Sequence, residues 1–445
     1  MKSNQITEGK VFPSLIKFAL PVMFALFLQA LYGAVDLWVV GQYAQTADVS
    51  GVATGSMLIQ TLTMVIMGLS MGITVVVGRK IGANETRDAG KAVGGGIFMF
   101  AVITVFLTVF TVLCSDMLSS LMHAPKEAFE ETSSYIAVCG AGSVFIIAYN
   151  VLGSIFRGIG DSKTPLLAVA IACVFNIIGD IIFVKYMNLG TVGAALATVV
   201  SQALSVLISL VIIKRRRLPF EFSFKDIRPH KGIIKTELSL GIPIALQDLL
   251  VGISFLVIQA IVNSINVIAS AGVGVGEKVC AFIMLVPSAF MQSMAAFVAQ
   301  NLGAGKPKRT NTALLCGILT SFSFGAVMFY LAFFHGDMLC GIFSSESDVI
   351  ASGHSYLKAY AIDCLLTPFL FCFSGYYNGY GKTVFVMAQG IIGAFCVRIP
   401  VVYLISRIPE ASLFHIGLGT PASTVVQIIF CLVMFIVMRR KIKKA

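Results

Sequence analysis

Residues 165–187 read PLLAVAIACVFNIIGDIIFVKYM, and this stretch decides the fold. Apart from Asn176, Asp180 and Lys185, it carries no strongly polar side chain. An apolar run of about 20 residues is long enough to cross the hydrocarbon core of a bilayer as a helix. Because backbone groups in lipid must pair within the chain, a run of this length indicates a helix rather than a barrel strand.

The rest of the chain repeats this pattern. With 57% hydrophobic and 12% charged residues and a mean hydropathy of +0.91, it cannot be a soluble globular protein. We predict an all-α polytopic membrane protein with about 12 transmembrane helices. The predicted helices cover residues 14–40, 51–77, 92–114, 133–156, 165–187, 191–213, 238–262, 268–299, 312–334, 354–377, 383–406 and 413–438.

Basic residues lie mainly on one side of the predicted helices. Most of the 32 Lys and Arg fall at the chain ends and in alternate loops, including residues 79–91, 214–235 and 306–309. Cytoplasmic loops of membrane proteins carry such an excess. We therefore expect a multi-pass protein of the cell (inner) membrane with both termini in the cytoplasm. On this interpretation the net charge of +11 reflects topology and the partner is the lipid bilayer, not nucleic acid.

The chain contains an internal duplication. A shift of 221 residues aligns three sets of anchors in order: Gly82-Ala83 with Gly303-Ala304, Asp116-Met117-Leu118 with Asp337-Met338-Leu339, and Gly158-x-Gly160 with Gly379-x-Gly381. With six helices in each copy, both copies enter the membrane in the same orientation. We expect two parallel six-helix bundles related by a pseudo-two-fold axis along the membrane normal. The predicted parts are an N-lobe (1–213), a cytoplasmic linker (214–237) and a C-lobe (238–445).

The sequence contains no sign of an enzyme or of a metal protein. Its ten cysteines lie almost entirely in apolar stretches, where a thiol behaves as a small hydrophobic group. No CxxC or HExxH motif occurs, and no nucleophile has a base at helical spacing. We predict no metal site, no cofactor and no enzymatic activity.

Asp36 lies in the first predicted helix on the same face as Gln29 and Tyr32, because residues three, four and seven apart share a helical face. Such a face suits a proton-carrying acid beside a site for cations, since aromatic rings attract positive groups. The alternative is an acid held by neighbouring hydroxyls or directed toward the membrane surface.

Asn176 and Asp180 lie one helical turn apart, so that their side chains project from one face. Thr198 in the next predicted helix adds a hydroxyl if the two helices pack together. These oxygen atoms suit a proton relay or a sodium ion. A purely structural hydrogen bond between helices is the alternative.

The second copy carries its own polar residues at membrane depth: Asp248, Glu277, Asp363 and Arg398. A charge at a helix centre costs about 2.5 to 3.5 kcal/mol on insertion scales, which favours a functional role for such residues. With Gln29 and Tyr32 they are our candidates for a substrate cavity, and an interhelical pair is the alternative. Arg398 is better suited to be a charge partner of an acid than a ligand-binding group.

The two copies differ in chemistry. A shift of 222 residues, the separation of Pro21 from Pro243, places Ile258 opposite Asp36, and the 221-residue shift places Val401 opposite Asp180. This asymmetry favours an ion site confined to the first copy.

Five short motifs occur in order along the chain: Ala19-Leu20-Pro21 through Asp36, Gly82-Ala83-Asn84, Arg157 through Pro165, Phe175 through Asp180, and Ala299 through Gly305. Together they resemble the multidrug and toxic compound extrusion (MATE) family over essentially the whole length. The resemblance implies a V-shaped pair of six-helix bundles that exchanges an inward sodium ion or proton for an outgoing, often cationic and aromatic, compound.

Within that family the chain looks closest to the DinF-like branch. The resemblance implies an N-lobe ion site of an Asp on helix one, an Asn and an Asp on helix five and a Thr on helix six. Those positions match four residues here: Asp36, Asn176, Asp180 and Thr198. The NorM-like branch emphasises acids on helices seven and ten, which contain Asp248 and Asp363 in this chain.

The expected function is therefore secondary active antiport. A monomer would export a small molecule, an organic cation, from the cytoplasm in exchange for inward H⁺ or Na⁺ by alternating access. The alternative is a flippase of lipid-linked precursors from the same wider superfamily, which would need arginines to bind pyrophosphate.

Overall fold

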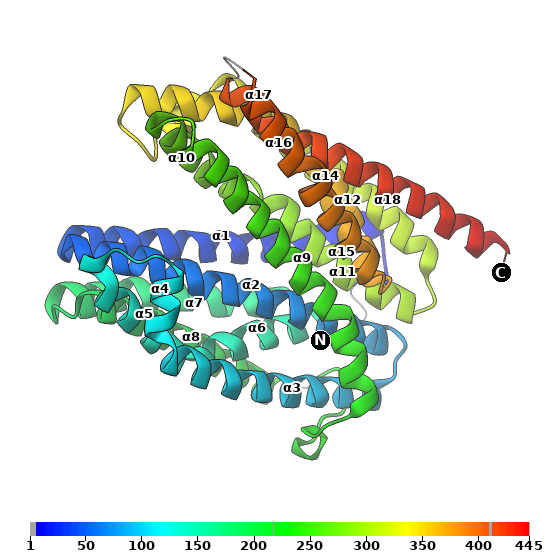
Figure 1. Cartoon of the computed structure of the whole chain (residues 1–445). Helices are drawn as coiled ribbons and strands as arrows, with labels where there is room; N and C mark the ends of the chain where they lie inside the picture. Colours follow the sequence, from blue (N-terminus) through cyan, green and yellow to red (C-terminus); the bar gives the residue numbers. More distant parts are fainter. Residues whose placement is uncertain (1–5, 217, 409–411, 445) are drawn as a thin grey trace. The chain divides into compact units, whose positions relative to one another are not determined.

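The structure, a computed structural model, describes residues 6–216, 218–408 and 412–444. Residues 1–5 and 445, at the outer ends of the predicted lobes, and residues 217 and 409–411 lie outside the described part. The described residues contain helices and no strand (Figure 1). In the first half these are α1 (Val11–Tyr43), α2 (Thr46–Gly82), α3 (Thr86–Leu113), α4 (Ser115–Leu121), η1 (Lys126–Ala128), α5 (Phe129–Ala141), α6 (Ser143–Gly158), α7 (Lys163–Asp180), η2 (Ile181–Tyr186) and α8 (Gly190–Arg215).

The second half has corresponding spans, although the helices are broken at different places. Its elements are η3 (Phe224–Asp226), α9 (Lys231–Asn263), α10 (Val267–Ile283), α11 (Leu285–Gly303), α12 (Pro307–Phe334), α13 (Gly336–Cys340), α14 (Ser347–Gly379), α15 (Thr383–Ile391), η4 (Ile392–Arg398), α16 (Ile399–Ser406), α17 (Leu413–Gly417) and α18 (Gly419–Lys444). In the described residues, 11 helices are long and apolar enough to cross a membrane, or up to 12 if one bent pair is a single span. The predicted all-α membrane fold is confirmed, and its number of helices equals the upper count.

The predicted span 133–156 is the bent pair. Helices α5 and α6 meet at an angle of 55°, with Gly142 between them. A Cβ atom on Gly142 would overlap the side chain of Val199 in α8, so that the close approach of α8 depends on glycine at this joint. In the 221-residue register Gly142 lies opposite Asp363, and α14 continues through that position unbroken.

The backbone itself records the duplication. Asn84 and Gly305 have φ angles of 59° and 69°, and Gly160 and Gly381 have φ angles of 83° and 72°. Left-handed φ angles are uncommon, above all for residues other than glycine. Both pairs are in the 221-residue register, so the two copies make the same turns after corresponding helices.

The chain divides into two compact units. Unit 1 holds the residues up to Gly9, Ile16–Ala245 and Ala299–Lys306, and unit 2 holds the remaining residues. Helix α9 is shared, because the division falls between Ala245 and Leu246. Pro243 lies inside α9 two residues before this division, where its missing N–H weakens the helix.

Unit 1 is built around α2. This helix packs against α3, α5, α6 and α8, which lie side by side in Figure 1. Gly55 allows the ring of Tyr135 in α5 to lie against the α2 backbone. The outer surface of α3 is apolar at positions on one helical face, as a helix in contact with lipid requires: Val102, Val105, Phe106 and Val109.

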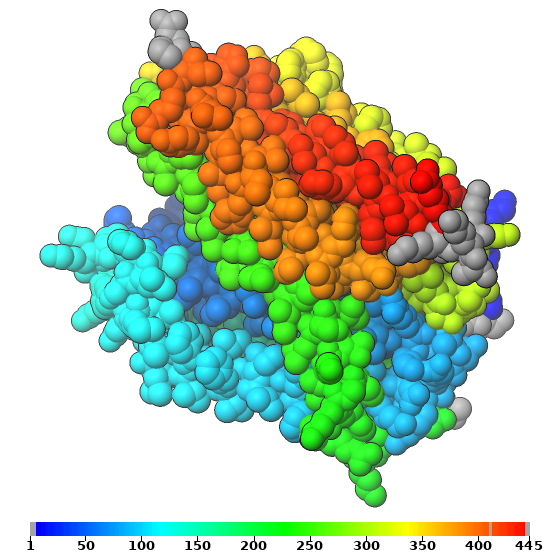
Figure 2. Space-filling model, turned by 45° about the vertical axis from the view of Figure 1, so that its right-hand side comes forward, coloured from blue at the N-terminus to red at the C-terminus, as the bar shows by residue number. Residues whose placement is uncertain are grey.

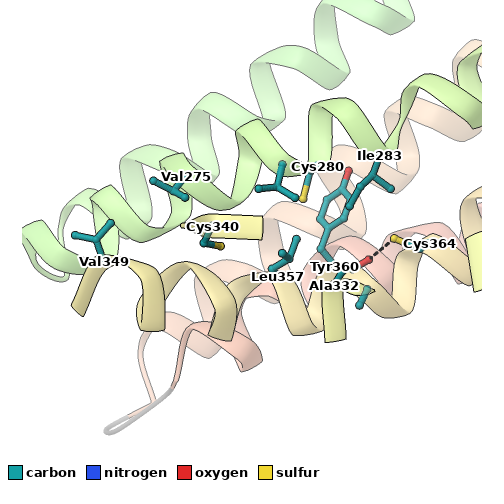
Figure 3. Close-up of a cluster of buried hydrophobic side chains, with 11 residues drawn as sticks. Val275, Cys280, Ile283, Ala332, Cys340, Val349, Leu357, Tyr360 and Cys364 are labelled. Carbon is teal, nitrogen blue, oxygen red and sulfur yellow. Dashed lines mark hydrogen bonds between the residues drawn. The ribbon is translucent and has the colours of Figure 1, made fainter. Parts of the chain in front are cut away.

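Unit 2 repeats this packing. Gly276 of α10 receives the ring of Tyr356 in α14, in the same register as Gly55 and Tyr135. Helices α10 and α14 also contribute to an apolar core that includes Cys280, Cys340 and Cys364 (Figure 3). These thiols pack among apolar side chains, as expected of small hydrophobic groups. Figure 2 shows α18 lying along the segment that contains η4, with which it is in contact.

The segment between α8 and α9 folds onto unit 1. Asp226 of η3 accepts two hydrogen bonds from the guanidinium of Arg87 in α3, at 2.8 and 2.9 Å, and one from the backbone N–H of Ser223 at 2.8 Å. The Ser223 N–H, with the Arg87 charge, holds the pKa of Asp226 below its usual range. A lowered pKa means that this stabilisation is complete at neutral pH and is lost as the pH falls through the folded-state pKa.

We expect Asp226→Asn to loosen this segment at neutral pH, because the amide cannot replace the carboxylate opposite Arg87. Limited chymotrypsin digestion should then cut several-fold faster after Phe222 and Phe224. The control is Asp88→Asn, which removes the partner of Lys91 on the same helix as Arg87 and should leave the cleavage rate unchanged. Equal cleavage of Asp226→Asn and the unsubstituted protein would contradict the docking role of this ion pair.

Candidate functional site

A group of buried polar side chains lies in unit 1 on α1, α7 and α8. Asp36 of α1 is 5% exposed, and Asn176 and Asp180 of α7 are 0% exposed. Asn176 and Asp180 lie one turn apart on the same face. Helix α7 packs along α8, which carries Thr198, so that the helix pairing needed by the sequence prediction is present.

The carboxyl groups of Asp36 and Asp180 lie close enough to interact directly. Within the described residues, neither oxygen of Asp180 and neither amide atom of Asn176 makes a well-formed hydrogen bond, and the same is true of Oδ1 of Asp36. The buried hydroxyl of Thr198 also makes no well-formed hydrogen bond within the described residues and lies beside Tyr135 of α5. Buried polar atoms without partners are rare, and their concentration here marks a site able to take a proton or a small cation.

The helix winding changes directly after Asp180. Helix α7 ends there and the π-helical segment η2, Ile181–Tyr186, begins. Short π segments inside α-helices are frequently found at functional sites. The corresponding helix of unit 2 also contains a π segment, η4, which ends at Arg398. Asp180 in unit 1 and Arg398 in unit 2 therefore both lie where the helix changes between α and π winding.

Two further predicted residues are held by hydrogen bonds across unit 1. Nε2 of Gln29 donates to the hydroxyl of Tyr149 in α6 at 3.2 Å. The hydroxyl of Tyr32 accepts from Nε2 of Gln202 in α8, also at 3.2 Å. Asp36 acts electrostatically on Tyr32, so that the aromatic ring lies beside the carboxyl pair as the shared helical face predicts.

Tyr135, Tyr149 and Gln202 belong to this site and were absent from the sequence prediction. Tyr135 is 3% exposed and lies within the electrostatic reach of Asp36. The sequence did offer one sign of its importance, because the 221-residue shift aligns Tyr135 with Tyr356. Tyr149 and Gln202 pair with residues 120 and 170 positions away, and no local pattern in a single sequence reveals such pairs.

A second polar group lies in unit 2. Arg398 is 6% exposed, its Nη1 donates to the hydroxyl of Ser254 at 3.1 Å, and its guanidinium carbon lies 4.4 Å from the ring centre of Phe255. Asp363 of α14, 2% exposed, interacts electrostatically with Arg398. A buried arginine requires such support from polar and aromatic groups, because an unpaired buried charge is costly.

Glu277 of α10 belongs to the same group, because it acts electrostatically on Tyr356 together with Asp363 and Arg398. One of its carboxyl oxygens is buried without a hydrogen bond to the described residues. Asp248 is half-buried on α9. The structure thus brings Glu277, Asp363 and Arg398 together within unit 2.

The unit 1 site has a definite chemical capability. Two carboxyl groups in contact in a low-dielectric interior cannot both remain ionised without a positive partner. A proton can satisfy this pair, and so can a hard cation with carboxylate, amide and hydroxyl oxygens as ligands. The nearby ring of Tyr32 adds a surface that attracts organic cations.

The family comparison matches the chain twice. The sequence model of the MatE family covers residues 21–182 and 243–404. The matches begin at Pro21 and Pro243, in the 222-residue register. The duplication is therefore a repeat of the unit that this family model describes.

Two bacterial proteins resemble the chain over nearly their full lengths. The probable multidrug resistance protein YpnP of Bacillus subtilis (strain 168) is 26% identical over 423 residues, 94% of each chain. The multidrug export protein MepA of Staphylococcus saprophyticus is 24% identical over 417 residues, 91% of this chain and 90% of the relative.

Solved structures share the fold. An outward-facing conformation of a multidrug resistance MATE family transporter of the MOP superfamily matches with a TM-score of 0.93 at 21% identity, covering 100% of this chain and 99% of that one. A crystal structure of MATE in complex with MaL6 matches with a TM-score of 0.92 at 21% identity over all of both chains. At this level of identity the likeness establishes the fold.

Proposed function

Since the chain belongs to the MatE family of multi-pass membrane transporters, we propose that it exports cationic, drug-like small molecules from the cytoplasm. Inward movement of H⁺ or Na⁺ drives this export by alternating access. The names of its bacterial relatives, a multidrug export protein among them, support this substrate class. As a transporter it is not an enzyme, which agrees with the prediction from the sequence.

The observation that carries the proposal is the buried pair of Asp36 and Asp180. Both acids are almost fully enclosed in unit 1, and their carboxyl groups lie close together. We assign ion coupling to this pair together with Asn176 and Thr198. Gln29 and Tyr32 line the substrate side of the same site in this proposal, and the second cavity contains Asp248, Glu277, Asp363 and Arg398.

The proposed mechanism is a competition for charge. A proton or sodium ion bound by Asp36 and Asp180 neutralises the site and weakens its attraction for a cationic substrate when the protein is open to the outside. Release of the ion into the cytoplasm restores the charge and the affinity. Pro21 lies inside α1 and provides a bending point, because it removes a backbone hydrogen bond.

The proposed architecture follows the duplication. An N-lobe (1–213) and a C-lobe (238–445), joined by a linker (214–237), would rock about the substrate site with both termini in the cytoplasm. The set of Asp36, Asn176, Asp180 and Thr198 supports assignment to the DinF-like branch, and a monomer contains all of these residues.

The test is transport by the purified protein in liposomes loaded with a fluorescent organic cation. A proton gradient and a sodium gradient are imposed in separate experiments. We expect one of the two gradients to drive nearly all of the dye movement. Liposomes without a gradient and liposomes without protein are the controls. Dye movement that does not respond to either gradient would contradict antiport, and failure to move any cation would favour the flippase.

A further inference from the structure

Helix α9 carries a buried acid that lies far along the chain from the ion-coupling residues. Glu237 is located two turns into α9, on the unit 1 side of the division at Ala245. It is 0% exposed. The predicted linker 214–237 ends at this residue.

The first part of α9 packs on unit 1 through glycines. A Cβ on Gly72 of α2 would overlap the carbonyl oxygen of Glu237, and a Cβ on Gly241 of α9 would overlap that of Leu69. On α3, the Cβ position of Gly96 lies 3.5 Å from Oε2 of Glu237. The side chain of Glu237 is therefore enclosed where α9, α2 and α3 approach one another most closely.

The carboxyl group has no counter-charge in this enclosure. Neither Oε1 nor Oε2 of Glu237 has a hydrogen-bond partner in the described part of the chain. The adjacent side chain of Ile73 is apolar and 0% exposed. An ionised carboxylate without a partner is strongly disfavoured in such surroundings, whereas the protonated acid is tolerated.

The other titratable groups on the packed elements do not supply that charge. Arg87 is paired with Asp226 and Lys91 with Asp88. Lys235 is exposed, and His230 lies just before α9, seven residues before Glu237. Seven residues correspond to about 10 Å along a helix. On α2, the residues that face Glu237 are glycine and isoleucine.

We propose that Glu237 is a proton-binding site, which takes up a proton when the first part of α9 docks on α2 and α3 and releases it when that contact opens to water. The ligand is the proton itself, because the described residues contain no group of three or more His, Cys, Asp or Glu side chains that could hold a metal ion. Pro243 lies in α9 just before the division of the two units and provides a place where the helix can bend. Opening of the contact would then expose the carboxyl group to water and release its proton. In the proposed antiport, this linkage makes the docked state more stable at low pH.

The experiment uses the full-length protein purified in detergent and needs neither substrate nor gradient. Thermal unfolding is followed from about pH 6 to about pH 9 for the unsubstituted protein and for Glu237→Gln, which mimics the protonated acid. Glu221→Gln is the matched control, because the side chain of Glu221 is exposed on the neighbouring segment. We expect the unfolding temperature of the unsubstituted protein and of Glu221→Gln to fall as pH rises, and the fall to be smaller for Glu237→Gln.

The sign follows from proton binding. A folded state that holds a proton which the unfolded chain has lost becomes less stable as pH rises. An identical pH dependence in Glu237→Gln and the unsubstituted protein would overturn the proposal. A second measurement does not require a reagent to reach the enclosed side chain: the infrared carbonyl band of protonated carboxyl groups should be weaker in Glu237→Gln than in Glu221→Gln at neutral pH. An equal band in the two variants would also overturn the proposal, while the transport assay judges the antiport separately.

Discussion

Asp36→Asn should reduce ion-driven efflux of an organic cation by roughly tenfold or more, the range of an ordinary coupling free energy. Asparagine has nearly the same shape as aspartate, so that the packing of α1 is retained. It cannot bind or release a proton, and it supplies one oxygen without charge to a sodium ion. Asp180 then lacks the second carboxyl group with which it interacts, and ion occupancy no longer changes the charge of the site by the same amount.

The measurement is dye efflux from proteoliposomes driven by the gradient that is effective for the unsubstituted protein. Asp116→Asn is the matched control in unit 1, because Asp116 is exposed at the start of α4. It should retain efflux. Full ion-driven efflux by Asp36→Asn, at equal protein content and equal thermal stability, would remove Asp36 from the coupling mechanism. Asp180→Asn should add little to Asp36→Asn, because residues that act as a pair have non-additive effects.

Helix positions were accessible from the sequence because lipid imposes a simple rule on composition. The predicted helix 383–406 agrees with the observed span Thr383–Ser406 at both ends. Charged residues immediately outside an apolar run, here Lys382 and Arg407, mark where a helix leaves the membrane. The fourth predicted helix is different, since it bends at Gly142, where α8 packs so closely that a Cβ atom would overlap Val199, a tertiary contact.

The candidate site could be predicted only in part, because some of its contacts join helices that are far apart in the sequence. Helical spacing predicts that Asn176 and Asp180 share a face, and the cost of burying a charge draws attention to Asp36. The contact between the carboxyl groups of Asp36 and Asp180 requires two helices far apart in sequence to meet. Glu237 was not among the predicted site residues, because charge alone does not distinguish an aqueous linker from a helix buried against glycines.

The second large effect is expected at Gly82, the last residue of α2. A Cβ on Gly82 would overlap the carbonyl oxygen of Gln300 in α11, and a Cβ on Gly303 would overlap that of Arg79 in α2. The ends of α2 and α11 therefore cross backbone to backbone within unit 1, each glycine against the residue three before the other. These are the glycines that the 221-residue register aligns.

We expect Gly82→Ala to lower the free energy of unfolding by about 1 to 3 kcal/mol, the usual cost of an added methyl group in a tightly packed position. A backbone carbonyl cannot turn away as a flexible side chain can, so that the crossing itself must widen. Thermal unfolding of the purified protein measures the effect. The control is Gly232→Ala in α9, where a Cβ meets nothing within 4 Å and alanine favours the helix.

The reciprocal substitution provides the sharper argument. Gly303→Ala should cost about as much as Gly82→Ala, because both methyl groups push apart the same two helix ends, and the double variant should cost less than the sum. An unfolding temperature of Gly82→Ala equal to that of Gly232→Ala would show that the crossing tolerates a Cβ atom. If the costs are instead equal and non-additive, the duplicated Gly-Ala motif is retained in both copies because each copy provides one half of a single backbone contact.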